Sequence, residues 1–119
     1  MRAKIVQEEV KQDEGTFYAL RVETKNANFL LLSEGEDQLG TLAAALPPTE
    51  KMVGPAVSSI LLGDRNVIIA RLLAERLAQR TSKIALASVF AKTINEKNAG
   101  KIFLQLLDET FKEREGKKK

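Results

Sequence analysis

The order of apolar and polar residues at the start of the chain predicts two strands. Residues 3–10 are expected to form the first and residues 16–24 the second, with a turn at Asp13-Glu14-Gly15, where glycine tolerates a positive φ. In the second run apolar and charged side chains alternate, as in a half-buried strand: Tyr18, Leu20 and Val22 on one side, Arg21 and Glu23 on the other. The two runs predict an antiparallel hairpin.

A third strand is predicted over residues 29–32, which are strongly apolar and follow a turn at residues 25–27. Residues 33–38 are acidic and contain glycine, so we expect a loop there.

Residues 39–46 are ambiguous, because alanine and leucine favour a helix by propensity. The flanking Gly40 and Pro47-Pro48 favour a strand instead. A loop over residues 49–55 and a strand over residues 56–62 complete this half of the chain.

A first helix is predicted from Asp64 or Asn66, either of which is a good N-cap, to about Arg80. Its apolar positions form one stripe and its arginines fall mostly outside it: Ile69, Leu72, Leu73 and Leu77, against Arg71, Arg76 and Arg80. Thr81-Ser82-Lys83 ends the helix. Residues 84–90 are apolar throughout, as expected of a central, well-covered strand.

The last helix has the clearest pattern, with apolar-face positions three and four residues apart: Ala99, Ile102, Phe103, Leu106, Leu107, Thr110 and Phe111. Charged side chains occupy the opposite face: Lys101, Asp108, Glu109 and Lys112. We expect this helix over residues 97–115, with Gly116 ending it. The stripe fits packing in the core of one subunit, or a face shared in part with a second copy.

The summed order β-β-β-β-β-α-β-α predicts an α+β fold, an antiparallel or mixed sheet of about six strands with two helices. The chain has 119 residues, 44% of them hydrophobic, which suits one domain with its own core. We expect that domain over residues 1–115 and a disordered basic tail over residues 116–119.

The composition limits which catalytic and metal-binding groups are possible, because the chain contains no cysteine and no histidine. Thiolate nucleophiles, disulfides, thiolate and imidazole metal sites, and imidazole acid–base catalysis are therefore excluded. The acidic residues form adjacent pairs of the solvated kind: Glu8-Glu9, Asp13-Glu14 and Glu36-Asp37. We expect no enzyme activity, no catalytic residues, no metal site and no cofactor.

Positive charge is concentrated in the second half of the chain. Residues 1–50 carry 5 Lys/Arg and 9 Asp/Glu, whereas residues 51–119 carry 14 and 7. The final Lys117-Lys118-Lys119 is expected to be solvated, or to contact nucleic acid or an acidic partner. Five phenylalanines, one tyrosine and no tryptophan provide little capacity to stack on bases, so nucleic acid is not the expected partner.

Residues 1–9 are too polar for a secretory signal, and the apolar runs near residues 42–46 and 67–70 are too short to span a bilayer. We therefore expect a cytoplasmic protein that does not bind membranes. The many charged residues, with Lys and Glu leading, and the absence of Cys, His and Trp lean towards a thermophilic source.

The segment Ser58-Ser59-Ile60-Leu61-Leu62-Gly63-Asp64 joins a strand to the first helix. We expect a structural joint: Leu61 and Leu62 as a buried pair, Gly63 in the turn, and Asp64 as an acidic cap that compensates the helix dipole. A helix N-terminus can attract an anion, but Asp64 already places a negative charge there. The segment has neither a phosphate-loop pattern nor the glycines of a nucleophile elbow.

This segment, the stretch Leu73-Ala74-Glu75-Arg76-Leu77-Ala78-Gln79-Arg80-Thr81-Ser82-Lys83 and the strand Ile84-Ala85-Leu86-Ala87-Ser88-Val89 resemble the C-terminal half of the small proteasome-assembling chaperones of types 3 and 4. Type 4 proteins have a similar Ser-Leu-Leu-Gly-Asp turn, a Leu-Ala-Gln-Arg-Leu stretch, a Lys-Thr-Asn-Lys break and an apolar strand. The likeness is specific over residues 58–89 and only topological over residues 1–50. With the composition, it suggests an archaeal homologue.

The resemblance implies a non-enzymatic chaperone that binds proteasome α-subunits and promotes or checks assembly of the α-ring, without ATP or a cofactor. It also implies a homodimer or a larger homo-oligomer. The chain departs from chaperones whose tails enter α-ring pockets, because those end in hydrophobic-Tyr-any residue and this one in three lysines.

A folded basic surface is therefore expected to meet acidic patches on the α-subunits, with these side chains as candidates: Arg65, Arg71, Arg76 and Arg80. The alternative function is that of a basic nucleic-acid-associated or adaptor protein, which the positive second half would also fit.

Overall fold

The computed structural model describes residues 3–12, 15–48 and 57–112. These residues form six strands and two helices: β1 (Lys4–Gln12), β2 (Gly15–Glu23), β3 (Ala27–Glu34), β4 (Thr41–Leu46), β5 (Val57–Leu62), α1 (Val67–Thr81), β6 (Ile84–Phe90) and α2 (Glu96–Glu109). The predicted α+β class and order of elements are confirmed. Several predictions lie outside the described residues: the turn at Asp13-Glu14, the loop over 49–55, and Gly116 with the basic tail.

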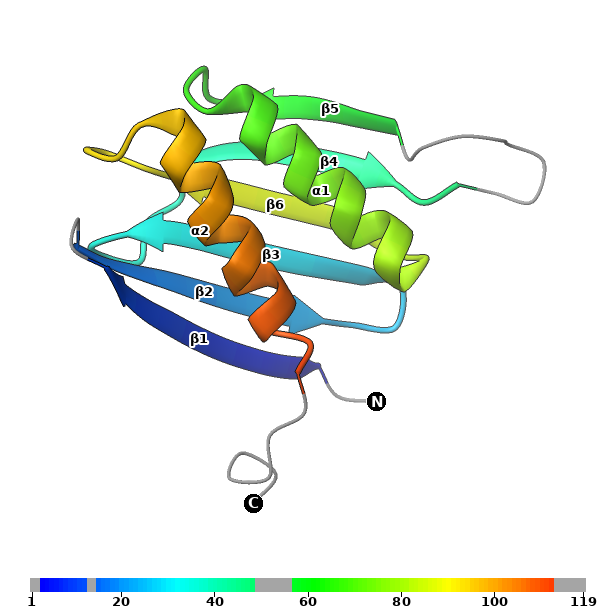
Figure 1. Ribbon diagram of the computed structural model, residues 1–119. Coiled ribbons are helices and arrows are strands. Elements are labelled where there is room, and N and C mark those ends of the chain that lie inside the picture. Colours follow the sequence, from blue (N-terminus) through cyan, green and yellow to red (C-terminus); the bar gives the residue numbers. More distant parts are fainter. Residues whose placement is uncertain (1–2, 13–14, 49–56, 113–119) are drawn as a thin grey trace.

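All six strands form one mixed sheet in the order β1-β2-β3-β6-β4-β5 (Figure 1). The predicted hairpin of β1 and β2 is confirmed, and β3 continues it as an antiparallel meander. β6 is inserted between β3 and β4, parallel to β3 and antiparallel to β4. The strand predicted to be central therefore lies in the interior of the sheet, and β1 and β5 are its two edges.

β3 is longer than the predicted strand over residues 29–32. Ser33 and Glu34, expected in a loop, still pair with β2 opposite Tyr18 and Phe17. Both are buried, and the loop after them begins at Gly35, which has a positive φ of 85°. Pairing with β2 therefore outweighs the polar character of the two residues.

α2 ends at Glu109, earlier than the predicted residue 115. The carbonyl oxygen of the next residue, Thr110, accepts a hydrogen bond from Nη2 of Arg21 at 3.0 Å, and the Thr110 hydroxyl donates to the carbonyl of Leu107 at 2.7 Å. The Arg21 guanidinium thus takes the place of the backbone N–H that would bond the Thr110 carbonyl if the helix continued.

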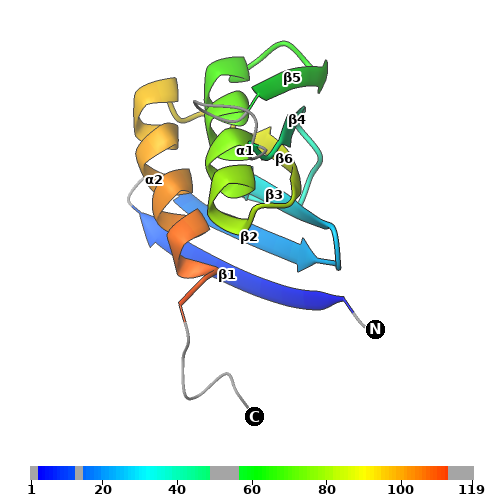
Figure 2. The same cartoon turned by 90° about the vertical axis from the view of Figure 1, so that its right-hand side faces the viewer.

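Both helices lie on the same face of the sheet, so the described chain has two layers (Figure 2). We call this the helix face. Its buried side chains include many small ones: Ala19 on β2, Ala43 and Ala45 on β4, Ala85 and Ala87 on β6. α1 turns alanines towards them as well: Ala70, Ala74 and Ala78. Small residues on both sides let the helix backbone approach the sheet closely.

α2 covers the strands at the other end of the sheet, and its predicted apolar stripe is buried within the single chain, apart from Phe111, which lies beyond the helix and is half-buried. Phe103 packs edge-on against Phe17 of β2, with ring centroids 6.0 Å apart. The stripe therefore belongs to the core. In α1, Ile69, Leu73 and Leu77 are buried as predicted, but Leu72 is 41% exposed and lies outside the stripe. No helix in the described residues is long and apolar enough to span a bilayer.

Arg21 departs most from the sequence pattern. The alternation along β2 is as predicted, but the side buried under the helices is the one that carries Arg21, whose exposure is 1%. Besides Thr110, its guanidinium bonds Oδ1 of Asn28 at 2.8 Å and Glu23 at 3.2 Å, and it lies 3.9 Å from the ring centroid of Phe111. Each of the three guanidinium nitrogens donates at least one hydrogen bond, which allows the charge to be buried.

Candidate functional site

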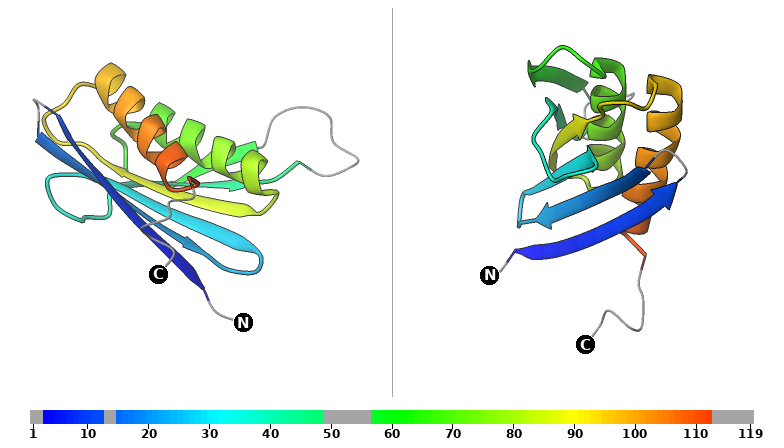
Figure 3. Two further views of the ribbon diagram at one scale, coloured as in Figure 1. Left: turned by 60° about the horizontal axis from the view of Figure 1, so that its bottom comes forward. Right: turned by 90° about the vertical axis from the view of Figure 1, so that its left-hand side faces the viewer.

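The face of the sheet opposite the helices has no described helix or strand packed across it (Figure 3). The loop between β3 and β4 reaches over part of it, where Ser33 and Ser88 are fully buried and the N–H of Gly40 donates to Ser88 Oγ at 2.8 Å. We call this side of the sheet the open face. The strand registers place these side chains on it: Ile5 on β1; Tyr18, Leu20 and Val22 on β2; Phe29 and Leu31 on β3; Ile84, Leu86 and Phe90 on β6; Leu42, Ala44 and Leu46 on β4. At its margins Ile5 is 61% exposed and Leu46 60% exposed.

The size of this patch distinguishes it from an ordinary solvent face. An antiparallel sheet with one wet side usually alternates apolar and polar residues, so that the wet side is polar. Here bulky apolar side chains lie next to one another across paired strands, such as Val22 opposite Phe29 and Phe29 beside Leu86. Contiguous exposed apolar patches on proteins mark surfaces that bind a partner.

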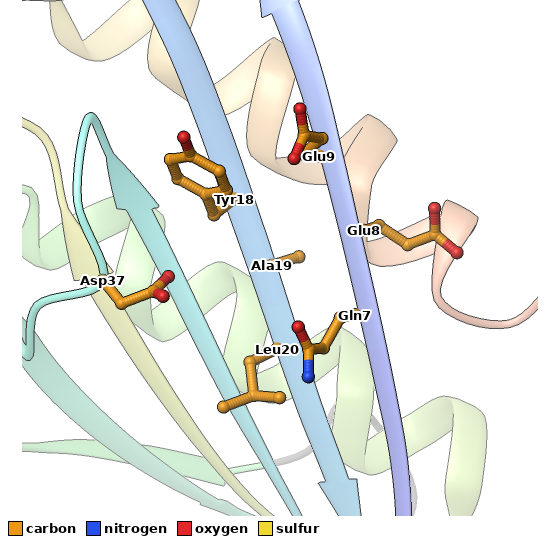
Figure 4. A pocket seen from close by; sticks show the side chains of 7 residues that line it. All are labelled: Gln7, Glu8, Glu9, Tyr18, Ala19, Leu20 and Asp37. Carbon is orange, nitrogen blue, oxygen red and sulfur yellow. The ribbon is translucent and has the colours of Figure 1, made fainter.

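At one end of the open face is a hollow of about 340 Å³. Its floor is formed by Tyr18 and Leu20, and Gln7, Glu9 and Asp37 form its rim (Figure 4). Asp37 comes from the loop between β3 and β4, which bends towards this side of the sheet (Figure 3). The hollow thus combines an apolar floor with an acidic rim.

Two described carboxylates have shifted pKa values, and both shifts are downward. A hydrogen bond from Lys83 lowers the pKa of Glu23 below 4.5, with burial acting against it. For Glu34, burial raises the pKa, but hydrogen bonds from the Thr93 hydroxyl and from the backbone N–H groups of Lys92, Thr93 and Ile94 outweigh it and lower the pKa. A general acid at neutral pH needs a raised pKa instead.

These two carboxylates hold parts of the fold together. Glu23 pairs with Lys83 at 2.8 Å and with Arg21 at 3.2 Å, joining the end of β2 to the start of β6. Glu34 fastens the loop before α2 to the end of β3. Neither lines the hollow. Among the described residues, no group of three or more acidic side chains is placed to hold a metal ion.

The four candidate partner-binding arginines do not form one cluster. Arg65 is exposed in the loop before α1, and Arg76 is exposed on the helix. Arg71 is also exposed, and its Nε donates to Ser58 Oγ on β5 at 3.1 Å. Arg80 points to the other side, where it pairs with Asp108 at 2.8 Å and stacks on Phe111 at 4.1 Å from the ring centroid.

The arrangement of Arg80 bears on recognition in two ways. A side chain already paired with Asp108 and stacked on Phe111 has less to offer a partner than Arg65, Arg71 or Arg76. Phe111 in turn lies within 4.1 Å of two guanidinium groups, those of Arg21 and Arg80, and so its ring is not presented as a platform for a base.

The joint between β5 and α1 is built differently from the prediction. Gly63 is in the turn as expected, with φ of 92°, and a Cβ there would lie 2.7 Å from the Cα of Thr41. However, the N-cap of α1 is Asn66, in the left-handed conformation and without a side-chain cap, and the first turn contains no acidic residue. Asp64 precedes the cap by two residues, so the predicted acidic cap is wrong.

The predicted burial of Leu61 and Leu62 is also wrong, because they are 55% and 48% exposed. β5 is an edge strand, and its register against β4 shifts between Leu42 and Ala43. No strand covers its outer side in the described part of the chain, and a bulge at an edge turns side chains away from regular alternation.

Sequence reasoning missed an apolar ridge on the outer side of α1. Ile68 is 70% exposed and Leu72 41% exposed, and both line a shallow groove of about 270 Å³ with Val67, Arg71 and Glu75. Ile68 falls outside the stripe of Ile69, Leu73 and Leu77, so helical periodicity was the signal that could have identified it.

No protein-family model and no curated protein sequence matches the chain. Among solved structures, it is similar to a chain from the crystal structure of a chaperone complex for yeast 20S proteasome assembly, with a TM-score of 0.66 and 15% sequence identity. The similarity covers 94% of this chain and 100% of that one. At this identity the likeness shows a shared fold.

Proposed function

We propose that this protein is a non-enzymatic chaperone that binds proteasome α-subunits and promotes assembly of the 20S α-ring. The observation that carries the proposal is the match in fold over nearly the whole length of both chains to a subunit of a proteasome-assembly chaperone complex. The likeness of residues 58–89 to the small assembly chaperones supports it independently, since it concerns side chains rather than the path of the backbone.

The open face is the surface through which two copies associate in this proposal. Its centre is mostly apolar and carries no charged side chain, so the same patch on a second copy can cover it without burying an unpaired charge. Face-to-face packing of two sheets about 10 Å apart is a common arrangement, and here it would leave the helices outermost. At roughly 25 cal/mol per Å² of buried apolar surface, even part of this face would contribute substantially to association.

With the open faces joined, the helix layer is what a dimer presents to other proteins. α1 then carries Arg71 and Arg76 towards solvent, and the loop before it carries Arg65; all three are already exposed in the single chain. These cations would select and orient acidic patches on α-subunits, because complementary charge mainly affects encounter and specificity. Arg80 contributes least, since it is paired with Asp108.

The proposal is tested by adding the purified protein at micromolar concentration to dissociated α-subunits and following ring formation by native electrophoresis. Co-purification with α-subunits and a change in the yield of rings are expected. The double variant Arg71→Glu/Arg76→Glu should weaken α-subunit binding at least tenfold, whereas Lys101→Glu on the outer side of α2 should leave it unchanged. Absence of both binding and any effect on ring formation would refute the proposed function.

A further inference from the structure

The groove on the outer side of α1 leaves apolar side chains in water. Ile68 is 70% exposed, more than any other large apolar side chain that the structure describes, and Leu72 is 41% exposed one turn further along the helix. With Val67 they make up most of the residues that line this groove of about 270 Å³. Because Ile68 contributes little to the core of the single chain, the groove is suited to a partner.

The same groove contains an arginine that two other side chains hold in position. Nε of Arg71 donates to Ser58 Oγ at 3.1 Å, and the Ser58 hydroxyl in turn donates to the carboxylate of Glu75. Ser58 comes from β5, whereas Arg71 and Glu75 are one turn apart on α1. These hydrogen bonds fix the direction of the guanidinium before any partner is present, which reduces the conformational entropy lost on binding.

The terminal nitrogens of Arg71 remain available for a ligand, because no residue in the described part of the chain accepts a hydrogen bond from Nη1 or Nη2. The side chain is exposed and lines the groove. A guanidinium with both terminal nitrogens available binds a carboxylate end-on through two parallel hydrogen bonds, which the ammonium group of lysine does not reproduce. Arg71 therefore gives the groove a specific site for a carboxylate.

The surrounding charges also favour an anionic ligand. Within residues 64–76, which include every side chain lining the groove, exposed cations outnumber exposed anions: Arg65, Arg71 and Arg76, against Asp64. Glu75 lines the groove too, but it is half-buried and its carboxylate already accepts the Ser58 hydroxyl. A complementary partner therefore carries a carboxylate next to an apolar side chain.

We infer that this groove is where the α-subunit is anchored: an apolar side chain of that subunit packs on Ile68 and Leu72, and a neighbouring Asp or Glu side chain is bound end-on by Arg71. The inference rests on the proposed function and narrows it from positive charge in general to one built site. Ser58 and Glu75 are positioning residues. Stacking of the open faces leaves α1 outermost, so a dimer presents the groove twice (Figure 2).

Two substitutions that conserve charge test the role of Arg71. Arg71→Lys keeps the positive charge but loses the two parallel hydrogen bonds, so its Kd for purified α-subunits, measured by isothermal titration calorimetry, should rise about tenfold. Arg76→Lys is the matched control on the next turn of α1, and it should change the Kd by less than about twofold. Equal Kd values for the two variants would overturn the inference.

Ser58 allows the positioning of Arg71 to be tested while the guanidinium stays intact. Ser58→Ala removes the acceptor of Nε and should raise the Kd about threefold. Ser58→Thr keeps a hydroxyl at this position and should restore the wild-type Kd. A Kd that stays at the wild-type value in Ser58→Ala would contradict the positioning role.

Ile68→Ser tests the apolar part of the groove, and should raise the Kd at least about tenfold. Because the side chain is 70% exposed, the variant should keep the wild-type circular dichroism spectrum and melting temperature, which separates lost binding from lost folding. Leu39→Ser is the matched control, since Leu39 is 55% exposed in the loop between β3 and β4 and does not line the groove. It should leave the Kd unchanged.

The outcomes distinguish this inference from the proposed function. If the wild type does not bind α-subunits, both fail. If the wild type binds and both Arg71→Lys and Ile68→Ser bind equally well, the groove is refuted while the proposed function stands. All variants should keep the wild-type mass in light scattering. Weaker binding that is accompanied by a smaller mass would also overturn the inference, because the groove would then hold a second copy of the chain.

Discussion

Under α1, the two faces of the sheet differ in the size of their side chains. On the helix face, β4 and β6 present Ala43, Ala45, Ala85 and Ala87, and α1 lies against them. On the open face the same two strands present larger groups such as Leu42, Leu86 and Phe90. On these two strands α1 therefore packs against mostly small side chains, whereas α2 packs against larger ones such as Phe17 on β2.

Polarity alone therefore does not identify the core of this protein. The side of β2 that carries Arg21 is buried, while no described helix covers the side with Tyr18, Leu20 and Val22. The variants below test this difference between the faces, beginning with the largest expected change in stability.

The two phenylalanines on opposite faces should respond very differently to truncation. Phe103→Ala removes a fully buried ring that packs against Phe17, and should lower the free energy of unfolding by about 4 kcal/mol. Phe29→Ala on the open face should cost about 1 kcal/mol or less in the monomer, because the ring is only partly buried there. Urea titrations at low protein concentration measure both, and equal losses would contradict the assignment of the faces.

Arg21→Ala should lower the free energy of unfolding by about 3 kcal/mol. It deprives the Thr110 carbonyl and Asn28 Oδ1 of their donor inside the core. Arg80→Ala is the control, since it also removes a guanidinium from the Phe111 ring but one that is largely solvated, and it should cost less than about 1 kcal/mol. A small effect of Arg21→Ala would show that α2 does not depend on this anchor.

Two neighbouring alanines of β4 test whether α1 needs small side chains beneath it. Ala43 is fully buried on the helix face, and Ala44 lies on the open face. Ala43→Leu should lower the free energy of unfolding by about 2 kcal/mol, because the added atoms push α1 away from the sheet. Ala44→Leu should change it by less than about 0.5 kcal/mol. If both substitutions are tolerated, close approach of the helix is not what the alanines provide.

The stabilisation from the hydrogen bonds that Glu34 of β3 accepts from the loop before α2 should depend on pH. The pKa of Glu34 is lowered on folding, so its stabilising contribution is complete above the ordinary pKa of 4.5 and is lost as the pH falls below that value. Glu34→Gln should cost about 1.5 kcal/mol at pH 7 and should flatten the fall in stability below pH 4.5. Chemical denaturation at several pH values measures this, and parallel pH profiles for the two proteins would exclude the role.

The sequence was sufficient for the class, the order of elements and most of the apolar stripes of the two helices, because these follow from local periodicity; Leu72 of α1 is the exception. The insertion of β6 between β3 and β4 depends on long-range pairing that no local pattern encodes. The burial of Arg21 could not be read from β2 either, since its partners Asn28 and Thr110 are supplied by β3 and by the end of α2.

The candidate site was predicted less well than the fold. Exposure of Leu61 and Leu62 follows from the position of β5 at the edge of the sheet, which becomes known only with the strand order. The separation of Arg71 from Arg80 likewise depends on which neighbour each meets, Ser58 in one case and Asp108 in the other. The assignment of α-subunits as the partner stays a prediction.

The most direct test of the account is the mass of the protein in solution, compared between the wild type and Leu86→Glu. Leu86 lies at the centre of the open face, between Phe29 and Ala44. Its replacement should change the stability of the monomer by about 1 kcal/mol or less, but it would bury a charge in any dimer that uses this face. We expect light scattering to give at least a dimer for the wild type and half that mass for Leu86→Glu. A monomeric wild type, or an oligomer that Leu86→Glu leaves intact, would contradict the proposal that the open face joins two copies.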